Sequence, residues 1–174
     1  MRRLTSKRFD LCANWSGSKT TLTTIDFMTT SELIYEHALR DIGLKEIDGP
    51  VSNPRIKLAI SFAADWLDKD DSKTAWCGCI RGLWAHETQT GSPAAYYRAI
   101  NWSKWGNKIT NLALAKQGDT VILGRTGGYH VGLFSSWDGK SPTFKLLGGN
   151  QSNQCSIASM RVDNIVSIRR AKTW

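Results

Sequence analysis

Cys77 follows Trp76 where a polar loop gives way to an apolar segment with a helical pattern. A cysteine at the first position of a helix faces unpaired backbone N–H groups and the positive end of the helix dipole, which favour the thiolate. A thiolate attacks electrophilic carbon in nucleophilic catalysis when a base lies within reach. Cys77 is therefore the candidate nucleophile.

Three histidines are available as the base, and His130 has the most suitable setting. It lies in a predicted strand in which His130, Gly132 and Phe134 share one face. Gly132 leaves that face bare beside the imidazole, so we expect the helix of Cys77 to approach there. The other two histidines lie on predicted helices in polar surroundings. His130 is thus the candidate general base.

A side-chain amide could complete the arrangement. Opposed residues of an antiparallel hairpin have a constant index sum, and a turn near Lys140 sets that sum at about 280. Asn150 then faces His130 across the two strands, where its amide could accept the ring N–H and fix tautomer and orientation. A slip of one residue in register would instead bring in Gly149 or Gln151.

Each of these residues also has a structural interpretation. A cysteine beside an aromatic residue is most often a small core hydrophobe, and a single histidine in a sheet is most often a hydrogen-bonded structural residue. Cys79 lies about 200° around the helix from Cys77. We therefore expect Cys79, like Cys12 and Cys155, to be an inert core residue.

Metal binding is the weaker interpretation of the remaining polar clusters. Cys77 and Cys79 have no partner pair at zinc-like spacing. Asp68, Asp70 and Asp71 could hold calcium, but they lack a binding-loop signature, and a solvated turn is the favoured interpretation. We expect no metal and no cofactor.

The composition is that of a soluble globular protein. The 174 residues suffice for one domain with a sizeable core, with 41% hydrophobic and 22% charged residues. No apolar run is long enough to span a bilayer, and the basic start lacks the apolar core of a secretory signal. We therefore expect synthesis in the cytoplasm without a signal peptide. The four cysteines are too few and scattered for a disulfide framework.

The formal net charge of +8 indicates an anionic partner. Nucleic acid, a membrane surface and an anionic wall polymer all fit this charge. The basic residues are spread along the chain and do not form the dense cluster that marks a nucleic-acid-binding surface. We therefore expect no specific nucleic acid as a partner.

The chain divides into a basic arm, residues 1–27, and one α+β domain, residues 28–174. Helical patterns come first, beginning at Thr30, Pro54, Cys77 and Ser92. The second has Asn53 as its capping residue, and the fourth reaches about Trp105. Strand patterns follow over residues 119–123, 129–137, 143–147, 155–160 and 165–169. Helices first and an antiparallel sheet second make an α+β layout.

Six short segments carry a resemblance to a known family. They are residues 42–50 (IGLKEIDGP), 52–56 (SNPRI), 76–77 (WC), 118–121 (GDTV), 128–132 (GYHVG) and 148–154 (GGNQSNQ). Over about residues 38–170 the chain resembles the NlpC/P60 and CHAP superfamily of papain-like cysteine hydrolases. Within it, the chain is most similar to small phage-type peptidoglycan hydrolases, the endolysins.

The resemblance implies a papain-like fold, in which N-terminal helices pack on an antiparallel sheet. It also implies Cys77 as nucleophile and His130 as base. Family members often add a second histidine, or a glutamate two residues before an asparagine. Here Gly148 occupies the glutamate position and Asn150 remains, so the orienting role falls to Asn150.

The resemblance further implies bacterial peptidoglycan as the substrate, cleaved at an amide bond in or next to the stem peptide. The enzyme would be an endopeptidase or an N-acetylmuramoyl-L-alanine amidase, a monomer that acts on the wall and causes bacteriolysis. The candidate substrate-binding residues are Trp76, Gly78 and Gln151. Gly78 is included because a glycine permits close approach of the substrate at the helix start. Trp102 and Trp105 could line a sugar groove, with core packing as the default.

Two alternatives to a lytic enzyme of this kind stay open. The same chemistry suits an amidase toxin delivered to rival bacteria. The chain could also be a non-catalytic wall-binding module in which the Cys–His pair is vestigial. A nucleic-acid-binding protein would explain the charge but not the arrangement of Cys77 and His130.

Overall fold

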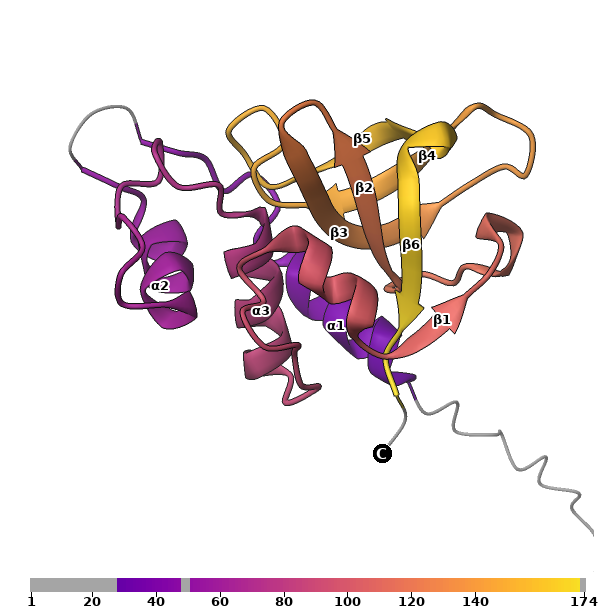
Figure 1. Cartoon of the computed structure of the whole chain (residues 1–174), viewed down its shortest axis with the longest axis horizontal. Coiled ribbons are helices and arrows are strands. Elements are labelled where there is room, and N and C mark those ends of the chain that lie inside the picture. Colours follow the sequence, from indigo (N-terminus) through magenta and orange to yellow (C-terminus); the bar gives the residue numbers. More distant parts are fainter. Residues whose placement is uncertain (1–27, 48–50, 173–174) are drawn as a thin grey trace, which may run out of the picture.

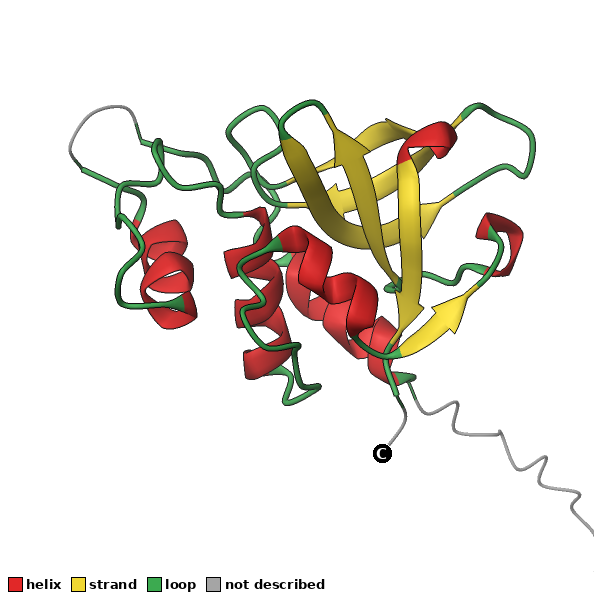
Figure 2. Ribbon diagram, in the orientation of Figure 1, coloured by secondary structure: helices red, strands yellow, loops and turns green. Residues whose placement is uncertain are grey.

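The computed structural model describes residues 28–47 and 51–172, so the arm predicted over residues 1–27 lies outside the described residues. Within these ranges the fold is α+β as predicted, with helices preceding an antiparallel six-stranded sheet of order β1-β6-β2-β3-β4-β5 (Figures 1 and 2). The α-helices are α1 (Thr30–Leu39), α2 (Pro54–Ala63) and α3 (Cys77–Glu87). The strands are β1 (Asn107–Ile109), β2 (Thr120–Arg125), β3 (Gly128–Ser136), β4 (Thr143–Gly148), β5 (Ser156–Arg161) and β6 (Ile165–Arg170). Single 3₁₀ turns are η1 (Ala99–Lys104), η2 (Leu112–Leu114) and η3 (Val162–Asn164).

Side chains cap the starts of the first two helices, which is why capping patterns in the sequence predict where these helices begin. Thr29 accepts from the backbone N–H of Glu32 at 3.3 Å, and the Glu32 carboxylate accepts from the Thr29 N–H at 2.7 Å, which completes a capping box. Asn53 caps α2 by accepting from the N–H of Arg55 at 3.0 Å, with Pro54 in the first turn. The predicted starts at Thr30 and Pro54 are therefore confirmed.

The helix predicted from Ser92 to Trp105 is wrong. Only η1 is helical there, and the segment before it is a series of turns in which Ala95 has φ 49°. Side chains take the carbonyl oxygens that a helix would need: Asn101 donates to the carbonyls of residues 94 and 95 at 3.1 Å, and Trp102 donates to that of residue 96 at 2.9 Å. Tertiary and side-chain contacts override the helical pattern here.

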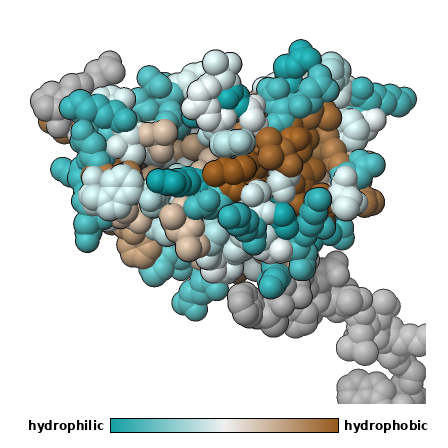
Figure 3. All heavy atoms as spheres, in the orientation of Figure 1, coloured by the Kyte–Doolittle hydropathy of each residue, from teal (hydrophilic) through white to brown (hydrophobic). Residues whose placement is uncertain are grey.

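Helix α3 packs against β3 with α1 beside it, and α2 packs on α3 on the side away from the sheet (Figure 1). Leu133 and Leu147 pack with Ile34, Ile60 and Trp84 in the core between the layers. Residues of alternate parity along the same strands, led by Phe134, Phe144 and Leu146, form a second apolar cluster on the other face of the curved sheet. In Figure 3 the most apolar part of the visible face lies over the sheet. The alternation predicted for β3 is therefore confirmed.

The β3–β4 hairpin has the predicted register over its regular part. Leu133 pairs with Leu147 and Phe134 with Leu146, so the index sum is 280. The pairing shifts by one between Phe134 and Ser136. However, β4 ends at Gly148, so position 150 lies beyond the ladder.

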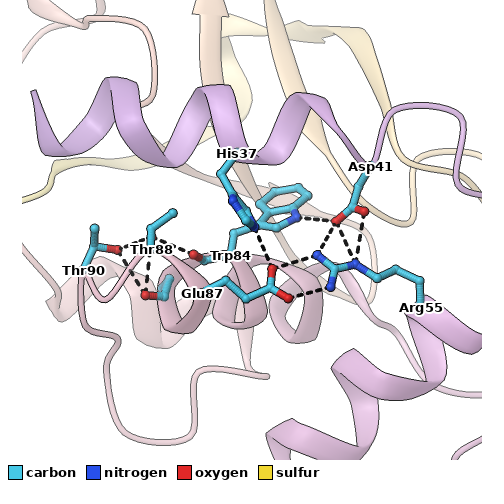
Figure 4. Close-up of polar contacts among 8 residues, drawn as sticks. His37, Asp41, Arg55, Trp84, Glu87, Thr88 and Thr90 are labelled. Carbon is cyan, nitrogen blue, oxygen red and sulfur yellow. Dashed lines mark hydrogen bonds and ion pairs between the residues drawn. The ribbon is translucent and has the colours of Figure 1, made fainter. Parts of the chain in front are cut away.

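The helical layer is fastened by a network of polar side chains (Figure 4). The guanidinium of Arg55 on α2 donates to Asp41 at 3.0–3.2 Å and to Glu87 on α3 at 2.6 and 2.8 Å. Asp41 also accepts from the indole N–H of Trp84 at 2.8 Å. Glu87 lies 2.7 Å from the His37 ring nitrogen on α1. We call these five residues the helix clasp, because they join α1, α2 and α3.

No helix of the described residues is long and apolar enough to cross a membrane.

Candidate active site

Cys77 is the first residue of α3, as predicted, and its side chain is nearly inaccessible, with 2% of its surface exposed. Its Sγ lies within reach of the backbone N–H of Val131 on β3, and of the N–H groups of Gly78 and Cys77 itself. These donors and the charge of Arg125 favour the thiolate, but burial outweighs them and raises the thiol pKa above its ordinary value. The expectation of a thiolate set by the helix dipole is therefore wrong for this state. Cys77 is a neutral thiol at pH 7.

His130 lies near the start of β3 and is also buried, with 4% of its surface exposed. Neither ring nitrogen has a hydrogen-bond partner. Burial, and to a lesser degree the charge of Arg125, lowers the pKa of His130 from 6.5 to about 4. At pH 7 the imidazole is therefore neutral, the form in which it can accept a proton.

The two residues reach β3 from opposite faces. Cys77 packs with Val131 on the helix face, and His130 projects from the other face. The expected approach of α3 along the Gly132 face is wrong, because β4 fills that face. A Cβ at Gly132 would lie 2.6 Å from the Leu147 carbonyl oxygen and 2.8 Å from the Leu146 side chain.

Cys77 consequently contacts β3 at the position next to His130, without a hydrogen bond to the imidazole. Sγ contacts the backbone of Val131, the residue after His130, and the described residues include no hydrogen bond between the thiol and the imidazole. The β3–β4 pairing begins only at Leu133, so the edge of β3 beside these groups is not covered by a β4 partner. The pair is adjacent but not assembled.

A cavity of about 320 Å³ opens on the His130 face of the sheet. Its lining includes the end of β2, the start of β3, the loop after β4 and part of β5. The uncharged polar members are His130, Asn150, Gln151, Ser152, Ser159 and Asn164. Arg125 carries the only permanent charge among the lining residues, all of which the structure describes. Cys77 is not part of the lining, so this space gives access to the base and not to the thiol.

The structure brings Gln151 to His130 and leaves Asn150 aside. Asn150 has φ 57°, follows the end of β4 and makes no side-chain hydrogen bond to the described residues, although it lines the cavity. The side chain of Gln151 is buried, and its amide N–H groups donate to the carbonyl oxygens of Gly148 at 3.0 Å and Ser156 at 2.5 Å. Gln151 was predicted as a candidate substrate-binding residue and as one of the two residues that a slip of register would bring to His130. The register is the predicted one where β3 and β4 pair, and Gln151 reaches His130 from the loop after β4 instead.

Two other candidate substrate-binding residues are not placed where a ligand could reach them. Trp76 is fully buried; its indole N–H donates to Glu46 at 2.7 Å, and its ring packs so closely on Gly149 that a Cβ there would overlap it. Gly78 is buried, and the space beside its Cα is filled by the Tyr97 carbonyl. Their small or flat surfaces serve packing within the chain, which corrects the expectation for both.

The loop that carries Gln151 is held by the segment 43–46. The backbone N–H of Gly43 donates to the Cys155 carbonyl at 2.9 Å, and the N–H of Cys155 donates to the Leu44 carbonyl at 2.8 Å. The N–H of Glu46 donates to the carbonyl of residue 153 at 3.0 Å. Because Glu46 also accepts from Trp76, one segment positions both the start of α3 and the loop after β4.

Two of the remaining cysteines are structural. Cys79 and Cys155 are buried free thiols, and burial raises the pKa of each to about 12, so both are inert as expected. Cys12 lies outside the described residues. Trp102 is fully buried beneath the Arg81 guanidinium, 4.2 Å from its ring centroid, which makes it a core residue and not a sugar-contacting one.

The aspartates at 68–71 have protein partners. Asp71 is buried and accepts from the Asn53 N–H at 2.7 Å, whereas the half-buried Asp70 pairs with Lys73 at 3.0 Å. Asp68 accepts from the N–H of Asp70 at 3.0 Å. The interpretation of a fully solvated turn is wrong for Asp71, which fastens the start of α2. Among the described residues, no group of three or more potential ligand side chains is arranged to hold a metal ion.

Comparison with known proteins gives a structural likeness only. Neither a protein-family model nor a curated protein sequence matches the chain. The structure of NlpC1 from Trichomonas vaginalis matches with a TM-score of 0.50 at 17% sequence identity. The match covers 86% of this chain and 47% of that one, so this chain spans about half the length of NlpC1. The chain therefore has the α+β fold of an NlpC protein.

Proposed function

We propose that the protein is a cysteine-dependent amide hydrolase that acts on bacterial peptidoglycan. The observation that carries this proposal is the meeting of Cys77 and His130 at neighbouring positions on β3. The thiol touches the backbone next to a buried, neutral imidazole, and that imidazole faces a cavity. The NlpC-like fold supports the same conclusion.

In the proposed reaction the thiol proton passes to His130 as Sγ attacks the carbonyl carbon of an amide. His130 then gives that proton to the leaving nitrogen, the C–N bond breaks, and a thioester and a free amine result. His130 next takes a proton from water, the hydroxide displaces Sγ from the acyl carbon, and the proton returns to the thiolate. Because both groups start neutral, proton transfer accompanies attack instead of preceding it.

The start of α3 supplies donors for the oxyanion. Trp76 provides no side-chain cap, so the first backbone N–H groups of α3 keep their hydrogen-bonding capacity. Those of Cys77 and Gly78 lie beside Sγ, where the carbonyl oxygen of an attacked amide would develop negative charge. The thiol is only 2% exposed, so substrate must displace part of its cover to reach it.

Charge supports a wall polymer as the substrate. The net charge is +8, and the permanent charge at the cavity is that of Arg125. Peptidoglycan stem peptides carry carboxylates, which a cationic cavity attracts. Within this proposal the protein is endolysin-like, acts on the wall outside the cytoplasm as a monomer, and cleaves an amide in or next to the stem peptide.

Digestion of purified sacculi tests the proposal. The wild type should release new amino groups, and Cys77→Ala and His130→Ala should release none while keeping the far-UV circular dichroism of the fold. Cys79→Ala is the matched control, because this thiol lies on the same helix but belongs to the inert core. Turnover retained by Cys77→Ala would refute the nucleophile. Mass spectrometry of the fragments identifies the bond.

A non-catalytic wall-binding module is the second candidate, favoured by the buried thiol with its raised pKa and by the missing hydrogen bond to His130. The same digestion separates the two, since a binding module sediments with sacculi but releases no amino groups. A toxin delivered to rival bacteria shares the chemistry of the first candidate. A neighbouring immunity gene would select it, and a neighbouring holin gene would select the phage-type role.

A further inference from the structure

We infer that Gln151, and not Asn150, is the positioning residue of His130, and that it holds the imidazole as the Nε2–H tautomer with Nδ1 as the proton-accepting nitrogen. Its catalytic consequence rests on the proposed function, but the pairing itself does not. The inference starts from three buried atoms without partners: both ring nitrogens of His130 and Oε1 of Gln151.

The orientation of the Gln151 amide is fixed by its neighbours. Nε2 donates to the carbonyl oxygens of Gly148 and Ser156, and it also lies 3.3 Å from the Ser156 hydroxyl. Rotating the amide by 180° would set Oε1 against two carbonyl oxygens, all of them acceptors. Oε1 is therefore the atom left over.

Gly148 shows where that oxygen points. A Cβ built on Gly148 would lie 3.3 Å from Nε2 of His130 and 3.5 Å from Oε1 of Gln151. Both atoms thus border the same small space, which exists because residue 148 has no side chain.

The chemistry of the pair selects the tautomer. Oε1 can only accept, so the facing nitrogen, Nε2, must carry the proton. Nδ1 is then the nitrogen with a free lone pair. In this structure the two groups are close enough for Gln151 to raise the pKa of His130, but they are not aligned as a hydrogen bond. Closing the bond satisfies two buried atoms whose unpaired state is costly.

The loop geometry is suited to such a fixed arrangement. The backbone N–H of Gln151 donates to the Gln154 carbonyl at 2.8 Å, which ties the loop to itself. Asn150, Ser152 and Asn153 have φ values of 57°, 53° and 61°, so three residues other than glycine adopt the left-handed region around Gln151. Such conformations persist where surrounding contacts enforce them. Asn150 itself has only the cavity beside it.

The ¹⁵N NMR spectrum of the His130 ring, recorded above pH 6 on protein without substrate, tests the inference. Pyrrole-type and pyridine-type nitrogens resonate in separate regions, so the tautomer is read directly. The wild type should show protonated Nε2 and bare Nδ1. Gln151→Met, which keeps the length of the side chain but removes the amide, should give a mixture of tautomers. Gln154→Met is the matched control in the same loop and should leave the spectrum unchanged.

The kinetic arm uses the same variants on sacculi. Gln151→Met should lower kcat about 100-fold with little change in KM, because a misdirected base slows the chemical step. Asn150→Ala should keep the Nε2–H tautomer and lose less activity than His130→Ala. An unchanged ring spectrum in Gln151→Met, or loss of the tautomer in Asn150→Ala, would overturn the inference. A wild-type protein with the Nε2–H tautomer and no hydrolysis would contradict the proposed function alone.

Discussion

The helix clasp and the His130 site differ in whether their polar groups have hydrogen-bond partners. In the clasp, Arg55 meets two carboxylates, and each carboxylate has a second donor from α1 or α3 (Figure 4). At the site, both ring nitrogens of His130 and Oε1 of Gln151 are buried without partners. Most buried polar groups of native proteins are paired, so unpaired ones need an explanation. The clasp stabilises the fold, whereas the site leaves Nδ1 of His130 free to accept a proton once Gln151 has paired with Nε2.

The helix starts show the same contrast. Side chains cap α1 and α2, whereas α3, which carries Cys77, has no side-chain cap. Capping contributes about 1 kcal/mol to helix stability. The chain omits this contribution at the helix where free N–H groups would serve a developing oxyanion. Packing of α3, which is buried from Cys77 to Ala85, holds the uncapped helix in place.

Breaking the clasp should have the largest effect on stability. Arg55→Met leaves Asp41 and Glu87 without their cation, and both carboxylates are partly buried. We expect the free energy of unfolding to fall by about 2–3 kcal/mol in chemical denaturation at pH 7. Lys57→Met removes the same charge from an exposed position of α2 and should change it by less than about 0.5 kcal/mol. Equal losses in the free energy of unfolding of the two variants would show that the clasp does not stabilise the fold.

The unpaired histidine should make stability fall on mild acidification. The pKa of His130 is lowered from 6.5 to about 4 in the folded state, so the unfolded chain takes up the proton first as the pH falls. This contribution is intact above pH 6.5 and is lost between pH 6.5 and 4. From pH 7 to pH 5 it amounts to about 2 kcal/mol.

Denaturation of His130→Leu over the same pH range provides the comparison. The variant should lack this part of the pH dependence, while His86→Leu, at an exposed site on α3, should keep it. A wild-type curve that runs parallel to that of His130→Leu would mean that the pKa of the imidazole is not lowered in the folded protein.

Local signals in the sequence were sufficient for most elements. Asn53 followed by Pro54 marks the start of α2, and alternation in β3 separates Val131 from His130. The sum of 280 in the hairpin follows from turn position alone. Each of these depends on residues close in the chain, where propensity and hydrogen bonding act without the rest of the fold.

The geometry of the site could not be predicted from local sequence patterns, because it depends on contacts between residues that are distant in the chain. Which face of β3 receives α3 is decided by Leu146 and Leu147, which fill the space that Gly132 leaves on one side. The pKa of Cys77 depends on burial by residues as distant in the chain as Val131, and this burial outweighs the local helix dipole. Gln151 reaches His130 because β4 ends three residues earlier and Asn150 turns the chain.

The rate of alkylation of Cys77 tests whether the thiol of the site is neutral and buried. Burial raises the pKa of this thiol, so little thiolate is present at pH 7, and only 2% of the residue is exposed. We expect iodoacetamide to modify Cys77 at least about tenfold more slowly in the native protein than in guanidinium, as measured by mass spectrometry of the Cys77 peptide. The native rate should rise with pH. A fast, pH-independent reaction near pH 6 would show a preformed thiolate and contradict the neutral pair.

Calcium should have the smallest effect, because the acidic turn at residues 68–71 is paired like the clasp. Asp71 holds the Asn53 N–H, and Asp70 is bonded to Ser72 and Lys73, which keeps the pKa of Asp70 low, at about 2. A cation would have to displace these donors and gather carboxylates that point to different partners. We expect calcium at about 1 mM to change Tm by less than about 1 °C relative to EDTA. The contrary result is a rise in Tm of more than about 2 °C that disappears in Asp70→Asn but persists in the control Asp65→Asn. It would show that the turn binds a cation and that its carboxylates, like the groups of the His130 site, are open to a ligand.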